Sequence, residues 1–140
     1  MPELTLEQAQ AIIAKTIEHG RKTDCAPLSV AVLDPGGHLR AFAREEGAGI
    51  VRPQLAMAKA WGSLGMGAGS RSLVGKSPEF IGALAAISDG RVFPSPGGVL
   101  VRDASGALLG AVGVTGDKGE RDEACAVAGI EAVGLIAQTG

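Results

Sequence analysis

The chain has 140 residues, of which 46% are hydrophobic and 20% charged, and its formal net charge is −2. A polypeptide of this length and composition is expected to fold as one globular domain. Because acidic side chains slightly outnumber basic ones, the composition argues against nucleic acid as a partner. No apolar segment approaches the ~20 residues that cross a bilayer, and the N-terminus lacks a signal-peptide core. We therefore expect no membrane partner and a cytoplasmic location.

Small residues dominate the composition, with 22 glycines and no tyrosine. A core built mainly from Ala, Val, Leu and Gly lets elements approach closely and leaves flat faces for another subunit, so we expect a homo-oligomer. Cys25 and Cys125 are too few for a disulfide framework, and their separation matches no zinc motif. We interpret them as buried or free thiols and expect no metal site.

The first half of the chain predicts a helix followed by a hairpin. Thr5 and Gln8 have capping-box spacing, and apolar residues then recur at helical intervals to about Lys22. The apolar run 28–33 and the alternating run 38–44 are separated by Asp34-Pro-Gly-Gly, which has strong turn chemistry. These runs predict two antiparallel strands.

The second half predicts two further helices and then a second hairpin. Pro53 begins a helix that should extend through Trp61 and fray early, because four glycines follow within 62–69. Ser77-Pro78 begins a short helix that ends near residue 89. The runs 99–103 and 108–114 predict a second hairpin, loosely similar to the first.

A last helix is expected after residue 119, with apolar positions running from Ala124 through Leu135 and Ile136. The whole order predicts an α/β protein of the α+β type. Its central antiparallel sheet is built from two hairpins and is flanked by helices.

Several segments in this order resemble the HbpS/GlcG-like haem-binding proteins, a family that includes the C-terminal domain of PduO-type corrinoid adenosyltransferases. The matching segments are Val30–Leu39, Arg44–Ala48, Ala58–Ala60, Pro96–Gly98, Gly110–Gly116 and Asp122-Glu123. The resemblance covers nearly the whole chain, so it implies a single domain of this kind over 1–140, with a profilin-like layered sandwich.

The resemblance also implies homo-oligomerisation and ligands that include haem in some members. Three positions depart from the family pattern. Glu46 stands where Asp is frequent, Gly62 where a small polar residue is frequent, and Leu100 where Pro follows the paired glycines. The last two lie beside the expected pocket and leave the ligand open.

Haem usually takes an axial His, Met, Cys or Tyr ligand. His38 follows a Gly-Gly turn at a hairpin end, where an imidazole is well held, so it is our candidate haem ligand. The alternative is an exposed or packing residue in a turn. His19 falls near the end of the first helix and is interpreted as a surface residue.

Lys59 stands among alanines on the second predicted helix. A lysine in apolar surroundings can bind an anion or act as a base, and it can also simply extend its ammonium to water. Asp122 and Glu123 begin the last helix, as caps or as acid/base partners of Lys59. These three are the candidate catalytic residues.

An anionic ligand would need further contacts around Lys59. The Pro-Gly-Gly loop can approach a ligand closely and form an anion-binding nest, or it can be a simple tight turn. The candidate ligand-binding residues are Arg44, Glu46, Arg52, Pro96, Gly97, Gly98 and Thr115.

Three functions remain open from the sequence. The first is an oligomeric small-molecule-binding protein that takes haem or another tetrapyrrole. The second is an enzyme that transfers protons on, or hydrates, a small oxygenated carboxylate in a catabolic pathway. The third is a non-catalytic accessory subunit.

Overall fold

The computed structural model describes residues 2–140. Its elements in chain order are α1 (Leu6–Lys22), β1 (Ser29–Leu33), β2 (Leu39–Arg44), α2 (Arg52–Met66), the 3-10 helix η1 (Ser70–Leu73), α3 (Pro78–Ile87), β3 (Gly98–Arg102), β4 (Leu108–Thr115), α4 (Gly119–Ala132) and β5 (Ile136–Gln138). Over this described range, no helix combines the length and apolar character needed to span a membrane.

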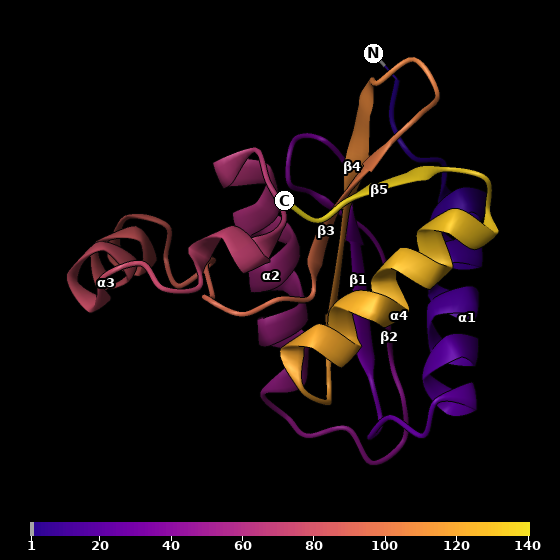
Figure 1. The fold of residues 1–140 in the computed structure, drawn as a ribbon, viewed down its shortest axis with the longest axis horizontal. Coiled ribbons are helices and arrows are strands. Elements are labelled where there is room, and N and C mark those ends of the chain that lie inside the picture. The colour runs from indigo at the N-terminus through magenta and orange to yellow at the C-terminus, as the bar shows by residue number, and fades with distance from the viewer. Residues whose placement is uncertain (1) are drawn as a thin grey trace.

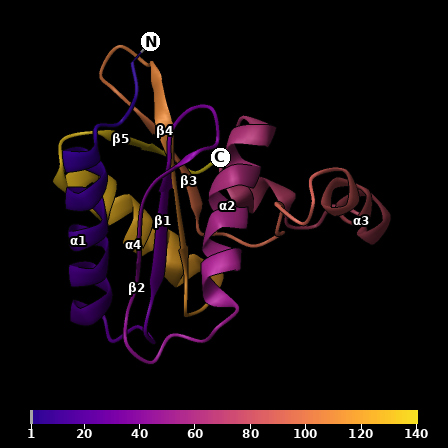
Figure 2. The same cartoon turned by 180° about the vertical axis from the view of Figure 1, so that it is seen from behind.

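The strands form one antiparallel sheet in the order β2-β1-β4-β3-β5. Helices α1 and α4 pack together on one face, and α2 covers the other face across β1, β4 and β3 (Figures 1 and 2). Both predicted hairpins are present, as the pairs β1–β2 and β3–β4. The predicted α+β class with a central antiparallel sheet between helices is confirmed.

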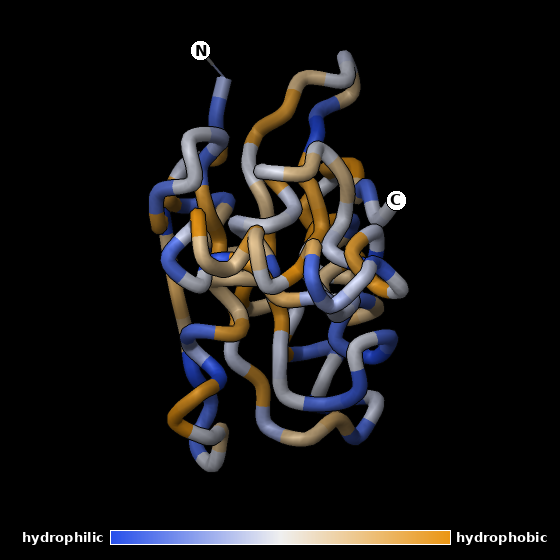
Figure 3. The backbone as a smooth tube through the Cα atoms, turned by 90° about the vertical axis from the view of Figure 1, so that its left-hand side faces the viewer, coloured by the Kyte–Doolittle hydropathy of each residue, from blue (hydrophilic) through white to orange (hydrophobic). Residues whose placement is uncertain are grey.

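The central strands are buried because helices cover both of their faces. Every residue of β1 is buried, and so is every residue of β4 after Leu108. Figure 3 shows several apolar segments running through the middle of the molecule. The largest fully buried side chains are Leu4, Ile12, Leu28, Leu73, Leu100, Ile130, Val30, Val32, Val99, Val101, Val112 and Val114.

The α1 helix begins as its cap predicts. Thr5 Oγ1 accepts a hydrogen bond from the backbone N–H of Gln8 at 3.0 Å, and Gln8 Oε1 accepts one from Thr5 N–H at 3.0 Å. This reciprocal pair satisfies two backbone donors that the first helical turn leaves free.

The backbone of α2 lies directly on the sheet. A side chain at Gly113 would collide with the carbonyl oxygen of Ala56, and one at Gly98 would collide with that of Lys59. The glycines of β3 and β4 therefore allow the close approach that a chain rich in small residues makes possible.

The early fraying expected at Gly62 is wrong, because α2 continues to Met66. Gly62 is buried, and a methyl group there would reach ordinary contact distance from Leu73 and Val92, 3.7 and 3.8 Å away. Tertiary packing therefore outweighs the low helix propensity of glycine at this position. The helix ends at Gly67, whose φ of 72° is left-handed.

The predicted length of the last helix is also wrong. The α4 helix ends at Ala132, and Ile136 lies in β5, which pairs with β3. Gly134, with a φ of 80°, turns the chain out of the helix after Val133. The sheet gains a fifth strand in this way, beyond the two hairpins.

The α3 helix projects away from the rest of the molecule (Figures 1 and 2). Ser77 caps its first turn as predicted, because its Oγ accepts a hydrogen bond from Phe80 N–H at 3.1 Å. None of the helix residues is buried, although most are apolar. Phe80 and the 82% exposed Ile87 are among the large hydrophobic side chains left on the surface.

Candidate functional site

The turn between β1 and β2 holds an aspartate and a histidine in contact. Asp34 Oδ1 accepts hydrogen bonds from the backbone N–H groups of Gly36 at 2.9 Å and His38 at 3.0 Å. The Asp34 N–H donates to the His38 carbonyl at 2.9 Å, and Gly37 takes the left-handed φ of 85° that the turn requires. The Asp-Pro-Gly-Gly sequence therefore fixes the backbone on both sides of the imidazole.

The His38 ring faces the Asp34 carboxylate through Nδ1, which lies 3.1 Å from Oδ1 and 3.3 Å from Oδ2. A carboxylate only accepts, so Nδ1 carries the proton in this contact, and the neutral imidazole in this tautomer has its lone pair on Nε2. The His38 side chain is 81% exposed, which leaves Nε2 open to a ligand.

The Asp34 carboxyl is ionised under ordinary conditions. Partial burial opposes its ionisation, yet hydrogen bonds from the N–H groups of His38 and Gly36 lower its pKa below the usual aspartate value. An ionised carboxylate holding one ring nitrogen is the arrangement that surrounds histidine ligands of metals.

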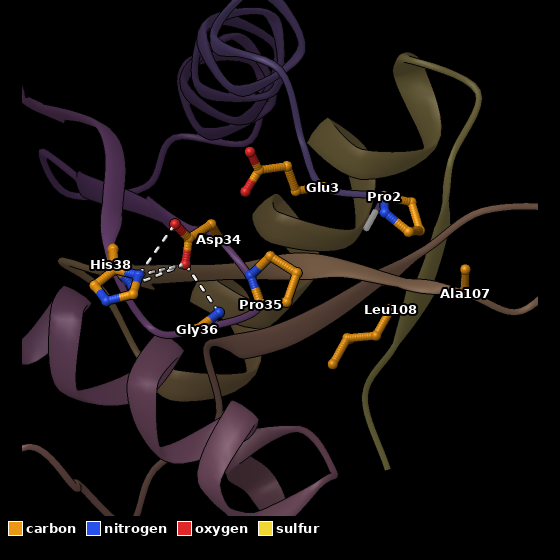
Figure 4. Close-up of a pocket in the computed structure, with 8 residues that line it drawn as sticks. All are labelled: Pro2, Glu3, Asp34, Pro35, Gly36, His38, Ala107 and Leu108. Carbon is orange, nitrogen blue, oxygen red and sulfur yellow. Dashed lines mark hydrogen bonds and ion pairs between the residues drawn. The ribbon is translucent and has the colours of Figure 1, made fainter.

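A cavity of about 600 Å³ lies beside this pair (Figure 4). Its lining combines apolar and acidic side chains, and Arg40 adds a cation through ion pairs with Glu3 at 3.2 Å and Asp34 at 3.9 Å. The lining residues are Pro2, Glu3, Asp34, Pro35, Gly36, His38, Ala107 and Leu108.

The turn between β3 and β4 has the same construction at the same end of the sheet. Asp103 Oδ1 accepts from the N–H groups of Ser105 and Ala107, Asp103 N–H donates to the Ala107 carbonyl, and Gly106 has a φ of 87°. Ala107 thus occupies the position that His38 holds in the first turn, and both line the cavity. Only one of the two matched turns carries an imidazole.

Lys59 lies at a second, deeply buried cluster. Its Nζ donates to Asp122 Oδ2 at 3.1 Å and to the Val114 carbonyl at 2.9 Å. Lys59 is 2% exposed and Asp122 is fully buried. The pair connects α2, β4 and α4, and the structure brings together the lysine and the aspartate that the sequence indicated.

Burial governs the titration of both groups. Removal from water lowers the pKa of Lys59 and raises that of Asp122, although their mutual attraction acts in the opposite direction on each. The cost of desolvation exceeds the gain from pairing. Burying the charged forms of Lys59 and Asp122 therefore reduces the stability of the folded state.

The Pro96–Gly98 loop packs against this lysine. A Cβ on Gly97 would lie 2.8 Å from Lys59 Nζ, so a larger residue would not fit. The N–H of Gly98 already donates to Ser70 Oγ at 2.8 Å, and the Gly97 carbonyl accepts from Val114 N–H. The Gly98 donor of the expected anion-binding nest is thus engaged within the protein.

Glu123 turns away from Lys59 and binds Arg71. Arg71 Nε and Nη2 donate to the two carboxylate oxygens of Glu123 at 2.9 and 2.7 Å. Sequence reasoning missed Arg71, because it lies in a segment of glycines and serines without helical or strand periodicity. This bidentate pair, which joins η1 to α4, becomes visible only in the folded structure.

The remaining candidates lie at the opposite end of the sheet from His38. Arg52 Nη1 donates to Thr115 Oγ1 at 2.9 Å, and Arg44 Nη1 donates to the Ala48 carbonyl at 2.7 Å. Glu46 is exposed in the loop after β2. The structure therefore joins Arg52 with Thr115. It places this pair and the Lys59–Asp122 cluster away from His38.

Two lining groups beside His38 also escaped the sequence interpretation, Asp34 as its partner and Glu3 as part of the cavity. The Asp34–His38 spacing across a glycine turn was the available signal.

Over residues 2–140, no group of three His, Cys, Asp or Glu side chains is arranged to hold a metal ion.

Comparison with known proteins assigns this chain to a family. A family model described as "Haem degrading protein HbpS-like" matches residues 4–131. No curated protein matches the chain at a significant level.

Solved structures share the fold over nearly the full chain. The Streptomyces reticuli HbpS double mutant is 28% identical, with a TM-score of 0.79 over 96% of this chain and 89% of that one. The PduOC:haem complex is 22% identical, with a TM-score of 0.81 over 95% and 96% of the two chains. The Klebsiella pneumoniae protein ORFY is 23% identical, with a TM-score of 0.82 over 94% and 90%. This chain belongs to the HbpS-like family.

Proposed function

We propose that this protein binds haem, that Nε2 of His38 would hold its iron and that Asp34 would orient the imidazole. The observation that carries the proposal is the Nδ1 contact with the Asp34 carboxylate at 3.1 Å, beside a cavity. A carboxylate on the second ring nitrogen fixes the tautomer and makes the ligating nitrogen more basic. In Figure 4 the second ring nitrogen, Nε2, lies on the side of the imidazole away from the Asp34 carboxylate.

The donor set and the lining fit the chemistry of haem. The ligand needs a nitrogen donor, apolar surface for the macrocycle and positive charge near its carboxylates. His38 supplies the first, and Pro2, Pro35 and Leu108 supply the second. The nearest cation among the described ion pairs is Arg40, which does not line the cavity but pairs with the lining residues Glu3 and Asp34.

Bound haem would supply redox and small-ligand chemistry at its iron. The protein's residues hold and orient it. Asp34 keeps the proton on Nδ1, the hydrogen-bonded turn fixes the backbone on both sides of the ring, and Pro2 and Pro35 give the cavity wall apolar surface. Support comes also from the family, whose model is described as haem-degrading, and from the shared fold of a PduOC structure with bound haem.

Self-association is the second part of the proposal. The α3 helix carries apolar side chains, has no buried residue and stands clear of the rest of the molecule (Figure 1). An exposed apolar arm of this kind is stabilised when a second copy covers it. The oligomer would therefore form around α3.

The haem proposal is tested by titrating the protein with haemin and following the Soret absorbance. Wild type is expected to shift the band with saturable stoichiometry, and His38→Ala to lose the shift. The matched control is His19→Ala, on α1, which should behave as wild type. An unchanged titration in His38→Ala would remove the ligand assignment.

An acid/base function at Lys59 and Asp122 is the second candidate. Its supporting observation is the contact of Lys59 Nζ with Asp122 Oδ2 at 3.1 Å, in a setting where burial lowers the pKa of the lysine and raises that of the aspartate. Turnover would be sought on a panel of small oxygenated carboxylates. Wild-type turnover that disappears in Lys59→Met supports this candidate, and no turnover on the panel rejects it for that substrate class.

A further inference from the structure

Two thiols that the haem site does not use lie together inside the protein. Cys25 follows α1 and Cys125 lies in α4, 100 positions apart in the sequence, yet their Sγ atoms are 3.7 Å apart. Both are buried and both are free thiols. A disulfide requires Sγ atoms about 2.05 Å apart, so the sulfurs need to approach by roughly 1.7 Å.

The end of α1 is built to place Cys25 against α4. Asp24 takes a left-handed φ of 56° directly after the helix, and Cys25 N–H donates back to the Gly20 carbonyl at 2.9 Å. This is the Schellman arrangement, which folds the residue after the turn back over the last helical turn. Gly20 lies beside the second thiol: a Cβ there would be in ordinary contact with Cys125 Sγ at 3.7 Å, and would collide with Leu28 Cδ1 at 2.6 Å.

Polar contacts tie the same loop to the start of α4. Ala26 N–H donates to Asp117 Oδ2 at 2.8 Å, and Arg121 Nη2 donates to the Thr23 carbonyl. These contacts lie on either side of Cys25 in the chain. The loop and the helix are thus held together in the fold with the two sulfurs facing each other.

We infer that Cys25 and Cys125 form an intramolecular disulfide when the protein meets a peroxide, which makes the pair an oxidative modification site. The inference is independent of haem binding, because both cysteines lie outside the His38 cavity.

The chemistry distinguishes the roles of the two sulfurs. Cys25 is the more accessible, at 4% exposed against 0% for Cys125. Burial and the neighbouring Cys25 raise the pKa of the Cys125 thiol to about 12, so it holds almost no thiolate at neutral pH. Cys25 is therefore the sulfur that attacks the peroxide, and Cys125 is the one that resolves the product.

The two steps balance. The Cys25 sulfur attacks one peroxide oxygen, the O–O bond breaks, and the products are a Cys25 sulfenic acid and water. The Cys125 sulfur then attacks the sulfenyl sulfur, the S–O bond breaks, and the departing hydroxide takes the Cys125 proton as a second water. The two sulfurs together lose two electrons, and the peroxide gains them.

The disulfide would join the loop after α1 to α4, one turn beyond Asp122. Cross-linking residues so far apart in the chain restricts the unfolded ensemble strongly. Oxidation should therefore raise the midpoint of thermal unfolding, and reduction should lower it again.

The test uses the full chain, reduced, freed of reductant and treated with hydrogen peroxide. The sample is then denatured in the presence of a thiol alkylator, which blocks any free thiol, and is analysed by mass spectrometry without reduction. The expected product is a monomer that has lost two hydrogens and takes up no alkylator. Its tryptic peptides 23–40 and 122–140 should be linked to each other.

Single variants separate the roles. After peroxide, Cys125→Ala should carry a sulfenic acid at Cys25 that dimedone traps, whereas Cys25→Ala should keep an alkylatable Cys125. The upward shift in melting midpoint should appear only in oxidised wild type and reverse with dithiothreitol. Two alkylated thiols after peroxide, or a disulfide between chains, would overturn the inference, and the wild-type peptide map gives that answer even if a variant misfolds.

Discussion

Nδ1 of His38 lies 3.1 Å from Oδ1 of Asp34, within a turn that the same carboxylate oxygen stabilises through two backbone N–H groups. One aspartate therefore sets both the backbone around the histidine and the orientation of its ring. The matched turn at Asp103 shows that the backbone function needs no histidine. The imidazole is an addition to a turn that is already stable, which is the reason to assign it to a ligand.

This relationship predicts the effect of Asp34→Asn on haem affinity. The amide oxygen can still accept the backbone hydrogen bonds, but the charge that holds Nδ1–H is lost. Haem affinity should fall about 10–100-fold, the usual cost of losing such a partner. The measurement is a haemin titration by Soret absorbance. Asp103→Asn in the matched turn is the control and should leave haem affinity unchanged, and an equal loss in both variants would point to general destabilisation.

The buried ion pair predicts an instability that depends on pH. In Lys59→Met the Asp122 carboxylate loses its cation, and the free energy of unfolding should fall by about 3–5 kcal/mol near neutral pH. The pKa of Asp122 is already raised above its ordinary value of 3.8, and it rises further without the lysine. The folded state then binds a proton that the unfolded state does not.

The sign of the pH effect follows from this proton. Stability is regained as the pH falls through the raised folded pKa of Asp122, so the deficit of Lys59→Met relative to wild type should shrink as the pH is lowered from neutral toward the ordinary aspartate value of 3.8. Urea unfolding at each pH measures it. The control is Lys59→Met with Asp122→Leu, which removes both charges and should be less destabilised than the single variant. A deficit that does not change with pH would contradict this view of the pair.

The sequence predicted most of the elements and located the Lys59–Asp122 cluster in outline. Capping residues, turn chemistry and apolar periodicity are local signals, and they correctly predicted α1, both hairpins and the start of α3. The lysine among alanines and the aspartate at a helix start were candidate acid/base partners, with a solvent-exposed lysine and a helix cap as the open alternatives.

The errors arose where tertiary contacts decide the structure. Helix propensity alone ends α2 at Gly62, and only the neighbours Leu73 and Val92 explain why it continues. The change from helix to strand at Gly134 depends on an open edge of β3 that no local pattern reveals. The pairing of Arg71 with Glu123 joins segments with no common sequence signal.

The close contact between α2 and the sheet predicts the effect of adding one methyl group. Gly113→Ala would bring its Cβ into the Ala56 carbonyl oxygen, so α2 must move or the strand must bend. We expect a loss of about 1–3 kcal/mol in the free energy of unfolding, measured by urea denaturation. Gly82→Ala in α3, where nothing lies within 4 Å of the new Cβ, is the control and should be neutral or slightly stabilising. Equal stability of the two variants would show that the contact is looser than described.

The α3 helix predicts an oligomer that a single charge disrupts. Ile87→Lys places an ammonium on the exposed apolar arm, and sedimentation velocity at micromolar concentration should show a shift from an assembly to the 14.0 kDa monomer. The folded monomer should keep its stability, because Ile87 is 82% exposed. Ile50→Lys, on an exposed loop residue away from α3, is the control and should sediment as wild type. A wild-type protein that sediments only as a monomer would contradict self-association itself.

The position of iron in a crystal of the haem-loaded protein tests haem binding through His38 most directly. Anomalous diffraction at the iron edge should place the metal at bonding distance from Nε2 of His38, with Nδ1 still facing Asp34. Iron bonded to a different side chain, or haem bound away from the cavity between the two matched turns, would contradict the assignment.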